Sequence, residues 1–306
     1  MNRIVLTNIR LLDGITRAAR DDYVVVTKGE RIEWIGPRGA ERFQDPTDMV
    51  YDLKGAYVLP GLWDMHVHLD FRMIPDSVGE PSLAESTLFA YRRALTFLNA
   101  GVTSLRVVGT HGGLDFSLRD GINCGEYLGP RILTAGPGLA STGGHGAIQG
   151  KGYDGPYEFR RAAREVVYHG ADLVKIMVTG GIIGRHEAFD ALQTMPDEVQ
   201  AVVKVAHQWG RHVAAHIASA QAAVMCAELG VDTIEHGYAL DKHALKVMKR
   251  HGVVYVPTLV VTDEPSYWSE VGLPHWAVAK VKQAASSHRL AVEMALEMGI
   301  AITLGS

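Results

Sequence analysis

The stretch PGLWDMHVHLD, residues 60–70, introduces the pattern that decides the fold of this chain. A short apolar run ends at two histidines, and similar runs recur along the chain with amphipathic segments between them. Strands that alternate with helices form parallel βα units, and eight such units predict a (β/α)8 TIM barrel of the α/β class. The candidate strands lie at residues 62–69, 102–109, 131–136, 173–180, 212–217, 232–237, 253–261 and 300–306.

Helical patterns occupy most of the intervals between these strands. Several end in glycine, which favours the left-handed conformation that terminates a helix. We expect helices near residues 82–101, 156–170, 195–210, 219–230, 241–252 and 275–298. The glycine-rich connection at 109–130 is expected to be irregular. No helical pattern follows the last candidate strand, so we expect a barrel without its final helix, in a chain that is truncated or part of a longer protein.

Residues 1–60 have a different texture from the rest of the chain. They are rich in β-branched residues and broken by turn residues, and they show no helical period. We therefore predict two domains. An accessory module resembling a β-sandwich occupies residues 1–60, and the barrel occupies residues 61–306 and is incomplete after its eighth strand.

Composition argues against several classes of protein. The 306 residues are 47% hydrophobic, which suits a globular protein with a large core. A formal charge of −4 and a pI of about 6.4 favour neither a nucleic-acid partner nor a membrane surface. The amino-terminal residues lack a signal-peptide pattern, and no apolar run is long enough to span a bilayer. With two cysteines there is no disulfide framework, and we expect a cytoplasmic protein.

The histidines of the first stretch, His66 and His68, are two residues apart on a strand. Their side chains therefore point to the same face, which at the carboxyl end of a barrel strand is the interior. Asp64 shares that face one step deeper. Imidazole is a common ligand of divalent metals, so the pair can hold one ion. Taken alone, however, the pair fits two hydrogen-bonded core histidines better.

Lys175 stands in the middle of the apolar run LVKIM, residues 173–177. An unpaired ammonium is costly to bury, and burial lowers the pKa of a lysine. A neutral amine can add carbon dioxide and become a carbamate, an anion that can bridge two metal ions. The alternative is a lysine whose head reaches solvent at the end of the strand.

Two further histidines, His216 and His236, end the fifth and sixth candidate strands. Small residues or glycine flank both, which leaves room at the mouth of a barrel. Each alone fits a structural role, but four histidines and a lysine at strand ends together favour a site with two metal ions. Glu235 is expected to point away from His236, toward the helix layer.

The chain resembles the amidohydrolase superfamily of metal-dependent hydrolases. PGLWDMHVH is similar to its opening signature, and the order His-x-His, Lys, His, His is similar to its binuclear subtype. LVKIMVTGG, STGGHG and GVDTIEHG resemble the branch of imidazolonepropionase-related proteins and prolidase-like Xaa-Pro dipeptidases. The resemblance covers essentially the whole chain.

This resemblance implies a role for each matched position. His66 and His68 would bind the more buried ion, His216 and His236 the more exposed one, and carbamylated Lys175 would bridge them. Two divalent ions, zinc above all, would activate a hydroxide that attacks a carbonyl. His145 in STGGHG would contact the substrate near the scissile carbonyl and take part in catalysis. The family's aspartate of strand eight would follow Ser306 directly.

Some positions depart from the family pattern. Ala218 stands where Xaa-Pro peptidases often carry a substrate-contacting tyrosine, and Tyr238 is a candidate substitute. The family's Arg-Asp pair after strand two is Arg106-Val107, so we expect a local ion pair to be lost. Arg185 could clamp a substrate carboxylate, or it could be a solvated loop charge.

The leading hypothesis is a metallohydrolase that cleaves a C–N amide bond in a dipeptide, an N-acyl amino acid or a related small amide. Hydrolysis of a non-peptide or cyclic amide, a mononuclear deaminase and an inactive metal-binding fragment remain alternatives. We expect a small molecule or dipeptide as the partner, without nucleic acid or membrane, and the barrel could form a homo-oligomer.

Overall fold

The computed structural model describes residues 3–40, 45–72, 81–270 and 272–306, and the chain divides into two units, Met1–Gly61 and Leu62–Ser306. The first unit holds one five-stranded sheet in the order β3-β2-β1-β4, with β5 also paired to β1. Its strands are β1 (Arg3–Leu11), β2 (Arg20–Lys28), β3 (Arg31–Pro37), β4 (Met49–Asp52) and β5 (Tyr57–Val58). The described residues thus form one sheet where we expected a sandwich.

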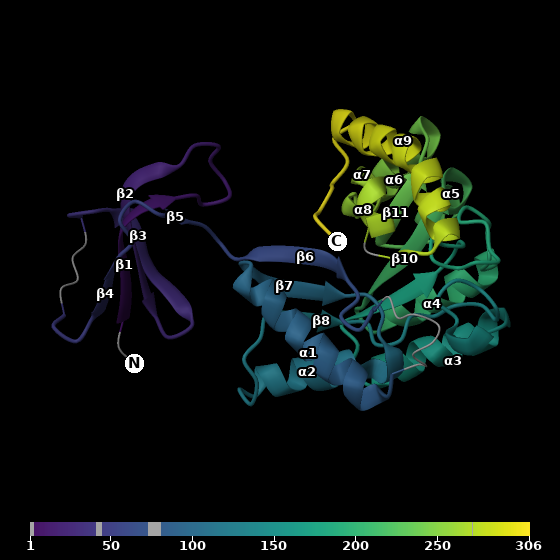
Figure 1. Ribbon diagram of the computed structural model, residues 1–306, viewed down its shortest axis with the longest axis horizontal. Helices are drawn as coiled ribbons and strands as arrows, with labels where there is room; N and C mark the ends of the chain where they lie inside the picture. Colours follow the sequence, from purple (N-terminus) through teal and green to yellow (C-terminus); the bar gives the residue numbers. More distant parts are fainter. Residues whose placement is uncertain (1–2, 41–44, 73–80, 271) are drawn as a thin grey trace. The chain divides into compact units, whose positions relative to one another are not determined.

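The second unit contains seven named strands, and every pair among them is parallel. One sheet has the order β6-β7-β8 (Figure 1), and the other has the order β12-β11-β10-β9. The strands are β6 (Leu62–Val67), β7 (Val102–Val107), β8 (Arg131–Thr134), β9 (Leu173–Met177), β10 (His212–Ser219), β11 (Thr233–Ala239) and β12 (Val254–Val256). This is the α/β architecture expected from the alternating pattern.

Backbone hydrogen bonds connect the outer edges of the two sheets. On one side, the amide of Leu139 donates to Lys175 O at 2.8 Å, and the amide of Met177 donates to Leu139 O at 2.8 Å. On the other side, residues 300–306 run between β12 and β6. The amide of Thr303 donates to Tyr255 O at 3.0 Å, and that of Met65 donates to Leu304 O at 2.9 Å. The eight segments therefore follow one another in the order of a (β/α)8 barrel.

Helices fill the intervals between the strands. Those between β6 and β11 are α1 (Leu83–Asn99), α2 (Leu114–Asn123), α3 (Gly155–Tyr168), α4 (Pro196–Gln208) and α5 (Ala220–Glu228). Those after β11 are α6 (Lys242–His251), α7 (Val260–Asp263), α8 (Pro265–Glu270) and α9 (His275–Glu297), and two 3₁₀ turns lie at His111–Gly113 and Ile148–Gly150. None of the helices in the described part of the chain is long and apolar enough to cross a membrane.

The expectation of an irregular connection at 109–130 was wrong, because α2 lies in the middle of it. Its glycines mark turns and close packing. Gly113 precedes the helix in the left-handed conformation, with φ of 69°. A Cβ on Gly121 would lie 2.3 Å from the ring of Tyr127. Leu114 and Leu118 are buried on the face that packs toward the sheet, and this apolar face stabilises the helix.

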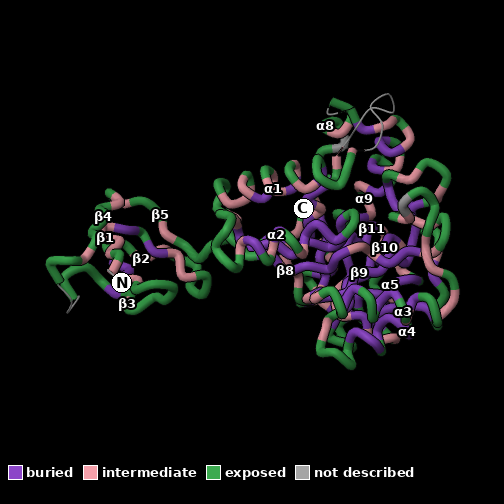
Figure 2. Tube along the Cα trace, turned by 90° about the horizontal axis from the view of Figure 1, so that it is seen from below, coloured by how far each residue is buried: buried purple, intermediate pink, exposed green. Residues whose placement is uncertain are grey.

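The core of the second unit lies between its strands and helices. Figure 2 shows β8–β11 as largely buried. Apolar residues of β9–β11 pack with those of α3–α6 in one buried cluster. This packing holds the strands in a parallel register that brings their carboxyl ends to the same side, and the predicted metal ligands lie there.

Candidate metal centre

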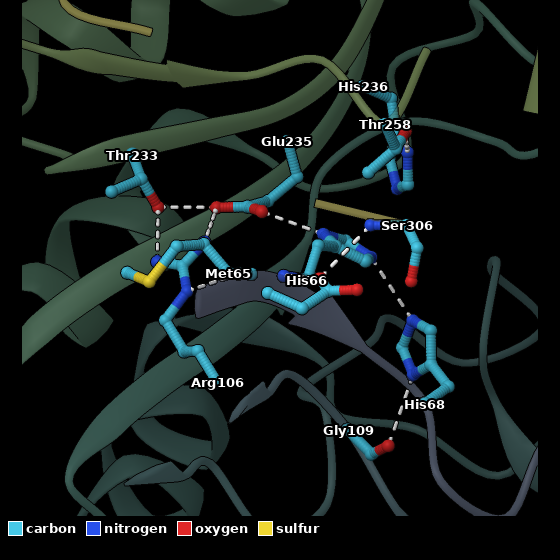
Figure 3. Close-up of polar contacts among 11 residues, drawn as sticks. Met65, His66, His68, Arg106, Gly109, Thr233, Glu235, His236, Thr258 and Ser306 are labelled. Atoms are coloured by element: carbon cyan, nitrogen blue, oxygen red, sulfur yellow. Dashed lines mark hydrogen bonds and ion pairs between the residues drawn. The ribbon is translucent and has the colours of Figure 1, made fainter. Parts of the chain in front are cut away.

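The four histidines predicted as ligands lie in one cluster, although they come from three strands. The ring centroid of His66 lies 5.1 Å from that of His68 and 4.6 Å from that of His236. The rings of His216 and His236 are 4.5 Å apart. Lys175 on β9 is close enough for its charge to help lower the pKa of all four histidines. Figure 3 shows His66, His68 and His236 around the end of β6.

Each histidine of the cluster has one ring nitrogen tied to the protein. His66 Nδ1 donates to Glu235 Oε2 at 2.7 Å. His68 Nδ1 donates to the carbonyl of Gly109 at 3.1 Å, and His216 Nε2 donates to that of Gly180 at 3.0 Å. His236 Nδ1 forms a hydrogen bond of 2.7 Å with Thr258 Oγ1. Such contacts orient a histidine and leave its other nitrogen available to a metal.

The contact between His66 and His68 tests whether a cation fits. Their Nε2 atoms lie 3.3 Å apart, and both rings use Nδ1 as the donor to an oxygen. If both rings are neutral, both Nε2 atoms carry lone pairs, and a cation shared by the two nitrogens would make their close approach favourable. Two nitrogen ligands of one tetrahedral ion lie about 3.4 Å apart, so the observed spacing fits shared coordination.

The cluster favours neutral imidazole, the form that binds metals. Burial, helped by the charge of Lys175, lowers the pKa of His66 to about 3 and that of His68 to about 4. Burial and a neighbouring histidine lower the pKa of His216 and His236 well below the usual value. All four rings therefore lack the extra proton of imidazolium at neutral pH, so a metal could bind them without first displacing a proton.

Lys175 is the most unusual member of this group. Its side chain is 1% exposed, and Nζ has no hydrogen-bond partner among the described residues. Burial lowers the pKa of its amine to about 8, although the carboxylate of Glu235 opposes that shift. A buried ammonium without a partner costs free energy, so this position favours the neutral amine.

The imidazole nitrogens of this cluster are of the kind that binds divalent metals, but the side chains are not all in position to hold an ion. No group of three or more histidine, cysteine, aspartate or glutamate side chains within the described residues has the geometry to hold an ion. The two Nε2 atoms of His66 and His68 have the spacing of two ligands of one ion.

Glu235 overturns one expectation from the sequence. We expected it to point toward the helices, yet its side chain is fully buried in the barrel and bonds to His66. In a regular strand Glu235 and His236 would face opposite sides. His236 has φ of 67° and Gly237 has φ of 61°, so the chain leaves regular strand geometry there. Both neighbours can therefore reach the same cluster.

Arg106, for which we expected a local ion pair to be lost, forms an ion pair with the distant Glu235. Its Nη2 donates to Glu235 Oε1 at 2.7 Å, and Thr233 Oγ1 donates to the same oxygen at 2.5 Å. Arg106 Nε donates in addition to the carbonyl of Met65 at 2.5 Å. The carboxylate that orients His66 is thus held on its other side by a buried guanidinium (Figure 3).

His145 joins the cluster from the loop after β8. Its ring centroid lies 4.4 Å from that of His216. Its Nδ1 donates to Glu187 Oε1 at 2.8 Å, and its backbone amide donates to Gln193 Oε1 at 2.8 Å. The sequence interpretation missed both partners. In the sequence, the one indication of such a role is that Glu187 lies two residues after Arg185, in the loop after β9.

The two other predicted substrate contacts lie in different places. Tyr238 is 2% exposed, and its ring stacks on His236 with centroids 5.3 Å apart, so it adjoins the cluster. Arg185 is exposed and lies over the ring of Trp276 at 5.1 Å. No described contact brings Arg185 to the histidines.

The comparisons with known proteins agree with this fold. The model of the amidohydrolase family matches residues 57–306, and the chain belongs to this family. A solved structure described as a Xaa-Pro dipeptidase with bound methionine in its active site has a TM-score of 0.90 and 30% identity. That match covers 99% of this chain and 79% of the other.

The matches to curated relatives cover a smaller share of those proteins' own length. Ochratoxinase of Aspergillus niger is 28% identical over 278 residues, which cover 81% of this chain and 57% of that protein. Imidazolonepropionase of Pseudomonas syringae pv. tomato is 49% identical over 51 residues, 17% of this chain and 12% of that protein. The chain thus spans little more than half of the ochratoxinase that it matches.

Proposed function

We propose that this protein is a hydrolase that uses two divalent metal ions, zinc in the first place, to cleave a C–N amide bond in a small substrate. The observation that carries the proposal is the cluster of four neutral histidines beside a buried lysine amine without a partner. Bound metal would polarise the scissile carbonyl and supply a water of lowered pKa. The family membership and the similarity to a Xaa-Pro dipeptidase support the same reaction class.

The more buried metal ion and the bridging group would be held by residues at the end of β6 and in β9. His66 and His68 would hold the more buried ion through their Nε2 atoms, with Glu235 and the Gly109 carbonyl fixing their orientation. The neutral amine of Lys175 would add carbon dioxide, form an N–C bond and release one proton, which yields a bridging carbamate. That anion would also relieve the cost of a buried lysine without a partner.

His216 and His236 would hold the second ion, and His145 would contact the substrate next to it. Because Glu187 accepts from His145 Nδ1, the Nε2 atom of His145 is the one left to hydrogen-bond a substrate. Tyr238 would line the same side through its stacking on His236. Arg185 stacks on Trp276 and is exposed, so it would act only on a substrate large enough to reach that surface.

The first substrate candidates are Xaa-Pro dipeptides and N-acyl amino acids, because two similar proteins are described as a Xaa-Pro dipeptidase and an ochratoxinase. A non-peptide amide or cyclic amide is the second candidate. It is favoured by Ala218, which is buried in an apolar cluster with Ile182 and Phe189 and offers no hydroxyl to a peptide.

Metal analysis together with a hydrolysis panel tests the proposal. The protein, purified without chelator, should contain close to two divalent ions per chain and should hydrolyse at least one amide in the panel. Metal without hydrolysis of any amide would favour a metal-binding fragment, and a protein that binds no divalent metal would overturn the proposal. Activity that survives Lys175→Ala would favour a mononuclear deaminase-like enzyme.

A further inference from the structure

The loop between β9 and α4 is fastened to α9 at its outer side. Lys280 Nζ donates to the carbonyl of Gly181 at 2.9 Å and to that of Gly184 at 2.5 Å. Trp276 Nε1 donates to the carbonyl of Ile183 at 3.1 Å. Three successive parts of the loop backbone are thus held by two side chains that lie one turn apart on α9.

The inner side of the same loop holds His145. Glu187 Oε1 accepts from His145 Nδ1 at 2.8 Å, and Glu187 Oε2 accepts from Gln193 Nε2 at 2.7 Å. Gln193 Oε1 in turn accepts from the backbone amide of His145 at 2.8 Å. The loop therefore grips both the ring and the backbone of His145.

The contacts with α9 and the contacts with His145 involve the same two glycines of the loop, Gly181 and Gly184. A Cβ on Gly181 would lie 2.0 Å from His145 Cε1, and a Cβ on Gly184 would lie 1.9 Å from Glu187 Oε1. The loop backbone is therefore in direct contact with the ring of His145 and with the carboxylate that orients it. Lys280 donates to the carbonyls of these same two residues, so it holds the loop backbone where that backbone contacts His145 and Glu187.

We infer that Lys280 is a positioning residue, which holds the 180–187 loop so that Glu187 keeps His145 oriented toward the cluster. The inference rests on the proposed function in so far as His145 contacts a substrate. Hydrogen bonds from a charged donor are stronger than neutral ones, and one ammonium here spans two carbonyls. The indole of Trp276 adds a weaker, neutral bond to the same loop.

Lys280→Met tests the inference, because methionine keeps much of the side-chain length and removes the donors. Lys282→Met is the matched control, since Lys282 is exposed on the same helix and forms no described bond to the loop. Backbone amides of residues 180–187 should exchange hydrogen about tenfold faster in Lys280→Met and at the wild-type rate in the control. Unchanged exchange would overturn the inference.

His145 itself provides the second measurement. The nitrogen NMR signals of His145, assigned by comparison with His145→Gln, should shift in Lys280→Met, while metal content stays as in the wild type. On an amide that the protein hydrolyses, KM should rise about tenfold with kcat less affected, and Lys280→Arg should restore part of the loss. Unaltered His145 signals would contradict the positioning role.

Failure of the proposed function can be recognised separately. If the wild-type protein hydrolyses none of the amides, the exchange rates and the His145 signals alone decide the inference, because neither requires a substrate. Faster exchange with displaced His145 signals would then support it, and either measurement without change would overturn it.

Discussion

One ion pair from each unit joins an arginine to a carboxylate, and these two pairs have opposite surroundings. In the second unit, the side chains of Arg106 and Glu235 are 5% and 0% exposed. In the first unit, those of Arg38 and Asp22 are 49% and 55% exposed. Removing charges from water is costly unless every polar atom finds a partner, whereas exposed pairs are screened. The buried pair therefore indicates a role beyond stability, and its contact with His66 supplies one.

The partners of Glu235 account for its charge. Burial alone would raise the pKa of this carboxyl, but the charge of Arg106 and the hydrogen bond from His66 hold the pKa below its usual range. Each of its oxygens accepts at least one hydrogen bond. A carboxylate in this state keeps the proton of His66 on Nδ1 and leaves Nε2 to a metal.

The largest effect is expected for Glu235→Ala. It leaves the guanidinium of Arg106 buried without its counter-charge, and breaking such a pair costs about 3–5 kcal/mol in the free energy of unfolding. Urea denaturation of the metal-free protein measures this loss. The double variant Arg106→Met, Glu235→Leu should recover most of the stability but not the metal affinity. A loss no larger than that of a surface pair would contradict this account.

Lys175→Met is expected to separate stability from metal binding. The wild-type amine is buried without a described partner, so methionine should leave the free energy of unfolding of the metal-free protein unchanged or raise it. Metal content should fall to one ion per chain or fewer, because the bridging anion is gone. Denaturation with chelator and metal analysis without it provide the two readouts. Marked destabilisation of the metal-free variant would show that Nζ has a favourable partner.

Tyr238→Phe should have a smaller effect on the fold. Phenylalanine keeps the ring that stacks on His236, so the free energy of unfolding should change by less than about 1.5 kcal/mol. If the hydroxyl contacts the substrate, kcat/KM should fall about tenfold, because the loss of one neutral hydrogen bond in the transition state lowers the rate by about that factor. Unaltered steady-state kinetics would remove Tyr238 from the substrate contacts.

The smallest effect is expected for Arg38→Ala in the first unit. Both partners of this pair are about half exposed, so the loss should stay within about 1 kcal/mol and should shrink further at high salt. Denaturation at low and high ionic strength measures it. A loss approaching that of Glu235→Ala would abolish the contrast between the two pairs.

Much of the second unit could be predicted from sequence because its signals are local. Short apolar runs alternate with amphipathic segments, and the six helices predicted from these segments correspond to α1, α3, α4, α5, α6 and α9, whereas α2 and the short α7 and α8 were missed. The glycines of α2 were taken as loop signals although one of them, Gly121, packs closely against Tyr127. Glycine has both uses, and only packing distinguishes them.

The candidate ligands were predictable for a related reason. In parallel βα units the carboxyl ends of the strands meet on one side, so ligand-type residues at those ends converge whatever the loops do. This places Lys175 and the histidines of β6, β10 and β11 without knowledge of any contact between them. Their metal and its chemistry remain proposals.

The sequence by itself determined which residues stand at the strand ends. The tertiary structure alone decided what holds them there. Glu235 lies 169 residues from His66 along the chain and pairs in register with His216, while its neighbour His236 reaches the same cluster because His236 and Gly237 adopt left-handed conformations. Alternation along a strand is local and visible in the sequence, whereas a departure from it is stabilised by packing between distant segments and appears only once the chain has folded.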